Sequence, residues 1–354
     1  MTSAESYTRN TSLMPSTAAV SLSKNSAFSS PLEKNEDDIK QFKLLKKVLR
    51  VINHQIKFGQ NFFSELIKRF TQVFTEKYSM EQSVNSSFIE PQARKSFLLR
   101  DPILLLADDS SPIKTKSRSM NMTVITDCSL TALDPQIILQ KAIAEIKEFR
   151  KIIIALLTEL IDCTLAVNWT PEVKRLLFEI ANSVLFGIND QLHNSLMKLI
   201  SAALGEKQEE LIRKAALMKK MSPKEFEIHS NFQMEGESHP YLTVVEAFNM
   251  NRQHLTPEDK FRTMCATKTE IIKAIDSYWN FKDPNKTRSE LELSADDLLP
   301  LYIYIISRSN VSRLLYDLYF IEEFLDTHSL NFTEDSYYFT TINAAVDYII
   351  SLSM

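Results

Sequence analysis

Two short polar stretches near the C-terminal end of the sequence have residue types that could act on a bound partner. The first, Ser294-Ala-Asp-Asp-Leu-Leu-Pro300, places two adjacent carboxylates, Asp296 and Asp297, two and three positions after a serine. A carboxylate at a helix start can cap the helix, and it can also bind a cation of another molecule. On local grounds capping is favoured, because a serine with an acid three residues later is typical of a capping box.

The second stretch, Glu334-Asp-Ser-Tyr-Tyr-Phe-Thr340, opens the last segment of helical periodicity and contains an adjacent tyrosine pair. Such a pair is typically divided between core and surface, because neighbouring side chains on a helix point about 100° apart. Neither stretch contains a nucleophile beside a general base. The six histidines and three cysteines lack metal-ligand spacing, so no metal site is expected.

The elements that position these stretches are predicted to be helices. Four glycines in 354 residues are too few for a Gly-rich phosphate loop or for many tight hairpins. This composition argues against Walker-type kinases, Rossmann dehydrogenases and sandwich or barrel folds, and it favours an all-α bundle. Helical periodicity follows Asp134, with Pro135, Pro171, Pro223, Pro240 and Pro257 near helix starts. The predicted helices are 135–166, 171–203, 207–220, 240–252, 256–280, 296–309, 312–326 and 338–352.

The N-terminal part of the chain divides into three segments by composition. Residues 1–34 are rich in Ser, Thr and Asn and are predicted to be disordered. Residues 35–82 form a long, basic, amphipathic helix in the prediction, bent near Gly59, and 83–132 are a loop-rich linker. We expect a helical bundle over 133–203 and a second helical domain over 204–354. No secretory signal and no membrane span is recognised, which favours a cytoplasmic protein.

The basic helix has two interpretations. Between residues 39 and 78 it carries nine basic and two acidic side chains, although the whole chain has a net charge of −4. The favoured interpretation is a helix docked on the acidic remainder of the protein. The alternative is peripheral contact with an anionic membrane, where each nearby basic residue adds about 1 kcal/mol. The candidate membrane-surface residues are Lys40, Lys43, Lys46 and Lys47.

Together with residues spaced between and before them, the two polar stretches resemble the catalytic half of the vacuolar-protein-sorting-nine (Vps-nine) domain. This family exchanges guanine nucleotide on endosomal Rab GTPases. The other residues that match the family pattern are Asn310, then Leu318, Ile321 and Phe324, an upstream element at Thr256, Pro257, Lys260 and Phe261, and a charged helix with its following turn at 204–223. The sequence departs from the pattern at Val311-Ser312, at Ser336 and in the longer, charged stretch 281–293.

The resemblance implies a guanine-nucleotide exchange factor for Rab-five-type small GTPases, without a cofactor and without covalent chemistry. It implies that Asp297 is an acidic finger directed at the P-loop lysine of the GTPase and that Tyr338 binds the switch region. Four further residues are expected to line the GTPase-binding groove: Leu298, Pro300, Leu301 and Thr340. Asp296 is expected to help start the helix and hardly touch the GTPase.

The partners implied are a Rab GTPase and an endosomal membrane that recruits the protein peripherally from the cytoplasm, with no nucleic acid. A non-catalytic helical adaptor, which binds a small GTPase or a membrane surface without stimulating nucleotide release, remains the alternative.

Overall fold

The computed structural model describes residues 36–59, 61–83, 134–165, 167–187, 190–237, 239–326 and 333–353. Within these ranges every regular element is an α-helix or a short 3-10 helix, which confirms the predicted all-α class. The chain divides into two units, 1–46 and 47–354, and each is described by itself. The predicted tail 1–34 and almost all of the predicted linker 83–132 lie outside the described residues.

The predicted basic helix 35–82, with its bend near Gly59, is two helices in the structure, α1 (Glu36–Phe58) and α2 (Phe62–Ser83). The break lies where a bend was expected. A Cβ on Gly59 would lie 2.4 Å from the carbonyl oxygen of Gln55, so the chain requires glycine there. Asn61 then starts α2, because its Oδ1 accepts a hydrogen bond from the Ser64 amide at 3.0 Å.

The next three helices are α3 (Pro135–Thr164), α4 (Pro171–Phe186) and α5 (Asp190–Met218). The predicted helix 171–203 is therefore interrupted at Gly187, where a Cβ would lie 2.7 Å from the Ser183 carbonyl oxygen. The predicted break between 203 and 207 is absent, because Gly205 lies inside α5. A glycine within a helix costs about 1 kcal/mol, which a long buried helix tolerates. The expected domain boundary at 203/204 thus falls within one helix.

The remaining elements follow the predicted segments closely. They are η2 (Pro223–Phe226), η3 (Ser230–Phe232), α6 (Leu242–Asn249), η4 (Met250–Gln253), α7 (Pro257–Lys282), η5 (Arg288–Leu291), α8 (Ala295–Arg308), α9 (Leu314–Phe324) and α11 (Glu334–Ser351). Helix α11 begins four residues earlier than predicted, because Thr333 caps it by accepting from the Ser336 amide. Four of the five prolines open helices as expected, whereas Pro240 precedes α6 by two residues.

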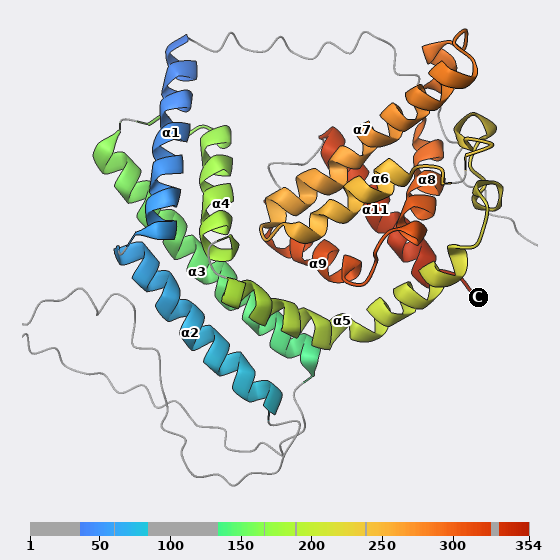
Figure 1. The fold of residues 1–354 in the computed structure, drawn as a ribbon. Helices are drawn as coiled ribbons and strands as arrows, with labels where there is room; N and C mark the ends of the chain where they lie inside the picture. Colours follow the sequence, from blue (N-terminus) through green and yellow to red (C-terminus); the bar gives the residue numbers. More distant parts are fainter. Residues whose placement is uncertain are drawn as a thin grey trace, which may run out of the picture. The chain divides into compact units, whose positions relative to one another are not determined.

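Helix α8 is the centre of the second unit's main core. Residues 301–306 are all buried, so this helix is enclosed on every side, and it packs against α11, α5 and α6. Figure 1 shows these C-terminal helices in yellow, orange and red. Apolar side chains from α5 to α11 complete one cluster around it. A helix held on all sides presents its exposed first turn in a fixed position.

A buried polar network joins α3 and α4 to the C-terminal helices. The Arg150 guanidinium donates to Asn182 Oδ1 at 3.1 Å and to the Phe324 carbonyl at 2.9 Å. Asn182 Nδ2 donates in turn to the same carbonyl at 2.8 Å and to Glu258 Oε1 at 2.6 Å. Burial raises the pKa of Glu258 to about 8. Because these groups are desolvated, they fix how α3, α4, α7 and the end of α9 meet.

Candidate functional site

The first turn of α8 combines a capping box with an acid pair. Ser294 Oγ accepts from the Asp297 amide at 3.3 Å, and Asp297 Oδ2 accepts from the Ser294 amide at 3.0 Å and from the Ser294 hydroxyl. This confirms the capping box expected from the sequence. Pro300 lies within the helix and has no N–H, so the Asp296 carbonyl has no donor four residues later.

The two carboxylates of this turn stand in different surroundings. Asp297 is half-buried and its Oδ2 is used within the cap, whereas Asp296 is exposed. Both acids lie in the first turn of α8, at the positive end of the helix dipole. An acid with one oxygen already engaged in two hydrogen bonds can still bind an incoming cation through its other oxygen, but it has fewer free lone pairs than an exposed acid. On this geometry Asp296 is the better placed of the two to meet a partner.

The predicted groove residues divide between core and surface. Leu298 is 3% exposed and Leu301 is fully buried, so both pack into the core beneath the site and do not line its surface. The expectation that these two residues line a GTPase-binding groove stays a prediction. Pro300 is half-buried, and Thr340 is exposed with its hydroxyl donating to the Ser336 carbonyl at 2.8 Å.

The tyrosine pair lies in the first turn of α11 and is divided between core and surface, as expected. Tyr338 is 6% exposed, whereas Tyr337 is 43% exposed, with the two ring centroids 5.6 Å apart in an edge-to-face arrangement. The Tyr338 hydroxyl donates to Glu334 Oε1. The residue predicted to bind the switch region is therefore the buried member of the pair, and its neighbour Tyr337 has the surface for contact.

Lys268 of α7 is a residue that sequence reasoning missed at this site. Its Nζ donates to Glu334 Oε1, the oxygen that also accepts from Tyr338, and lies 4.5 Å from the centroid of the Tyr338 ring. Hydrogen bonds from Lys268 and Tyr338 lower the pKa of Glu334, while burial and then the bond to Glu334 raise the pKa of Tyr338. No local sequence signal joins Lys268 to Glu334, which is 66 positions away.

The upstream element that matched the family pattern has a structural role. Thr256 caps α7 by accepting from the Asp259 amide at 3.2 Å. Lys260, 1% exposed, forms a 3.0 Å ion pair with Asp317 of α9. Burial lowers the pKa of Lys260, and the charge of Asp317 opposes this shift. The element thus fixes α7 against α9.

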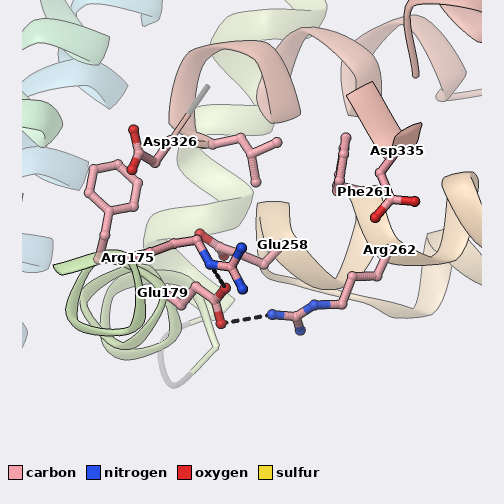
Figure 2. Close-up of a pocket in the computed structure, with 9 residues that line it drawn as sticks. Arg175, Glu179, Glu258, Phe261, Arg262, Asp326 and Asp335 are labelled. Carbon is pink, nitrogen blue, oxygen red and sulfur yellow. Dashed lines mark hydrogen bonds and ion pairs between the residues drawn. The ribbon is translucent and has the colours of Figure 1, made fainter. Parts of the chain in front are cut away.

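A cleft of about 100 Å³ lies between α4 and α7 and includes no predicted site residue (Figure 2). Glu179 joins its walls, accepting from Arg262 at 2.8 Å and pairing with Arg175 at 3.5 Å. Ligand pockets typically enclose about 300–1,000 Å³, so this cleft is small for a cofactor. Its charged side chains connect the two helices.

Neither a metal site nor a membrane-spanning helix is found among the described residues. Among them, no three His, Cys, Asp or Glu side chains gather as they would around a metal ion. None of the described helices combines the length and the apolar character that crossing a bilayer requires. Lys40, Lys43 and Lys46 in the first unit, and Lys47 in the second, are each exposed.

Comparison with known proteins agrees with the sequence motifs. Residues 241–354 match the model of the Vacuolar sorting protein 9 (VPS9) domain, the family that the two polar stretches resemble. The Rab5 GDP/GTP exchange factors of Mus musculus and Homo sapiens are each 33% identical over 96 residues, which is 27% of this chain and 18% of theirs. Ras and Rab interactor 3 of Homo sapiens is 29% identical over 108 residues, which is 30% of this chain and 10% of that protein.

The chain thus matches these relatives over less than a fifth of their length, and the segment that matches the family model contains both helix starts described above. Residues 241–354 of this chain belong to the VPS9 domain family.

Proposed function

We propose that this protein is a guanine-nucleotide exchange factor for a Rab-family GTPase, with members of the Rab5 subfamily as the first substrates to test. The observation that carries the proposal is an exposed carboxylate on the first turn of a fully enclosed helix, within the segment that matches the VPS9 domain. The relatives named as Rab5 exchange factors support the choice of substrate.

The chemistry required is displacement of charge contacts, with no covalent step. A small GTPase holds its nucleotide with about 12–16 kcal/mol, corresponding to nanomolar to picomolar affinity. Much of this comes from a P-loop lysine and Mg²⁺ on the phosphates. A carboxylate held close to that lysine forms a charge-assisted hydrogen bond with it and repels the β-phosphate. The GTPase then releases GDP and binds the nucleotide in excess.

Two acids could supply this carboxylate, and we propose Asp296 over Asp297. Asp296 is exposed, whereas Asp297 Oδ2 already accepts from the amide and the hydroxyl of Ser294. By the same argument from exposure, Tyr337 is the tyrosine that contacts the switch region, and Tyr338 supports it from beneath. The original assignment to Asp297 and Tyr338 stays a prediction that the same experiment tests.

The experiment is release of a fluorescent GDP analogue from a panel of Rab GTPases. We expect the wild-type chain to accelerate release from one or more of them and Asp296→Asn to lose at least about tenfold, equivalent to about 1.4 kcal/mol. Asp297→Asn, in which the amide oxygen still accepts from Ser294, is the matched control. If Asp297→Asn loses exchange and Asp296→Asn keeps it, the original assignment holds. Binding without acceleration, by a folded chain, would support the adaptor function instead.

We further propose that α1 contacts an anionic membrane, through which the protein is recruited peripherally to endosomes from the cytoplasm. The support is the exposure of Lys40, Lys43, Lys46 and Lys47, each of which could add about 1 kcal/mol near anionic lipid. Sedimentation of the full chain with vesicles containing phosphatidylserine should exceed sedimentation with neutral vesicles. Changing the four lysines to glutamine should abolish the difference, and unchanged binding would reject the role.

A further inference from the structure

We propose that Lys268 of α7 is a positioning residue for nucleotide exchange, holding the first turn of α11 so that Tyr337 stays directed toward the GTPase. This inference rests on the proposed function, and it concerns a residue outside both polar stretches of the sequence. Lys268 contacts two residues at the start of α11, because its ammonium binds Glu334 and lies over the ring of Tyr338.

Lys268, Glu334 and Tyr338 each contact the other two. Glu334 Oε1 accepts from both Lys268 Nζ and the Tyr338 hydroxyl, so one carboxylate oxygen links α7 to two positions of α11 one turn apart. The ammonium also lies 4.5 Å from the Tyr338 ring centroid, which is within range of a cation–π interaction. The Tyr338 ring packs edge-to-face on Tyr337. Moving Lys268 therefore changes the support directly beneath the exposed tyrosine.

Other contacts keep α11 in place without Lys268. Cys265 Sγ donates to the Asp335 carbonyl at 3.2 Å, and the rings of Phe261 and Phe339 lie 5.4 Å apart. Further along the helix, Ile342, Ala345, Val346 and Ile349 are buried in the core. We therefore expect the helix as a whole to stay packed when Lys268 is changed, and the effect to be confined to Glu334 and the two tyrosines.

Because the Lys268–Glu334 ion pair is largely exposed, its effect on exchange can be measured apart from its effect on folding stability. The side chains of Lys268 and Glu334 are 25% and 68% exposed, and an exposed pair contributes about 0–1 kcal/mol to folding. Exchange is more sensitive, because a displacement of about 1 Å at a contact can cost up to about a hundredfold in rate. Changing Lys268 should therefore affect the rate of GDP release far more than the midpoint of unfolding.

The test compares three variants of the full chain in the GDP-release assay, measured over a range of GTPase concentrations. Lys268→Ala should lower kcat about fivefold to tenfold, by the same sensitivity to placement. Lys268→Arg, which keeps a cation for Glu334 and for the ring, should restore kcat to within about twofold. Lys273→Ala is the matched control, since Lys273 lies on the same helix and forms an exposed 2.8 Å pair with Glu270; it should release GDP like the wild type.

The outcomes separate this inference from the proposed function. Wild-type rates in Lys268→Ala, or equal losses in Lys268→Ala and Lys268→Arg, would overturn the positioning role alone. A loss accompanied by a matching fall in the melting temperature, with Lys268→Arg failing to rescue either, would assign Lys268 to folding and also overturn it. A folded wild-type chain that releases GDP from no GTPase in the panel would overturn the proposed function, and this inference with it.

Discussion

Asp297 belongs both to the capping box of α8 and to the motif that resembles the VPS9 family. Its Oδ2 completes the capping box with Ser294, so it contributes to the stability of α8. Losing a cap typically costs about 0.5–2 kcal/mol, whereas an exposed side chain such as Asp296 contributes within about 0.5 kcal/mol. We therefore expect Asp297→Ala to lower the free energy of unfolding in urea and Asp296→Ala to leave it nearly unchanged. Equal effects would mean that the cap does not form.

Glu258 gives a prediction about pH. Its folded pKa of about 8 lies above the ordinary value of 4.5, so between these values the folded protein keeps a proton that the unfolded chain loses. Stability from this group is full below pH 4.5 and falls as pH rises toward about 8. Glu258→Gln removes the titration while keeping an oxygen for Asn182. The melting temperature of Glu258→Gln, relative to that of the wild type, should increase from pH 4.5 to about pH 8 and then level off. A difference in melting temperature that stays constant with pH would contradict the raised pKa of Glu258.

Sequence reasoning located both polar stretches and assigned Asp297 and Tyr338 within them, an assignment that stays a prediction. The capping box at Ser294 was predictable, because it depends on residues three positions apart. Which of the two tyrosines is buried was not predictable from the sequence. Helix α11 packs against α7 and α8, so the burial of Tyr338 depends on residues far away in the sequence. Lys268 was missed for the same reason. Long-range packing, which has no local sequence signal, determines which tyrosine is buried and which lysine lies beside it.

The helices themselves were predictable where a cap or a proline marks their start. Pro171 and Pro257 open α4 and α7, each after a threonine that accepts from the backbone. The errors came from glycines. Gly187 ends α4 and Gly205 lies within α5, although both occur in similar apolar surroundings. No local pattern in the sequence separates the glycine that ends a helix from the one that lies within it.

The pairing of α7 with α9 through Lys260 and Asp317 leads to a prediction at the level of elements. Both side chains are 2% exposed, so removing one leaves a buried charge without its partner. Such a loss typically costs about 3–5 kcal/mol, whereas replacing both by apolar residues is often neutral. Lys260→Met should therefore strongly lower the urea midpoint. Lys260→Met with Asp317→Leu should recover most of it, and additive losses in the double variant would exclude this coupling.

At the scale of the whole molecule, the match to the VPS9 domain covers less than the folding unit that contains it. The match begins at residue 241, yet the core around α8 also includes Leu211, Ala215 and Met218 of α5, and Phe226, Ile228, Phe232 and Met234 of the segment after it. Hydrogen bonds from a side chain of α5 also hold the backbone of the matched segment. Gln208 of α5 donates to the Val311 carbonyl at 2.7 Å and accepts from the Leu315 amide at 3.0 Å.

A fragment of residues 241–354 should therefore fail to fold cooperatively. Removing one large buried side chain typically costs about 2–5 kcal/mol, and a domain has about 5–15 kcal/mol in all, so losing this part of the core exceeds the total. A fragment of residues 134–354 keeps these residues and the Arg150–Asn182–Glu258 network. It should unfold in one sharp urea transition, whereas 241–354 should show a broad one and weak near-ultraviolet dichroism. A sharp transition in the shorter fragment, at the midpoint of the longer, would mean that the matched segment folds without α5.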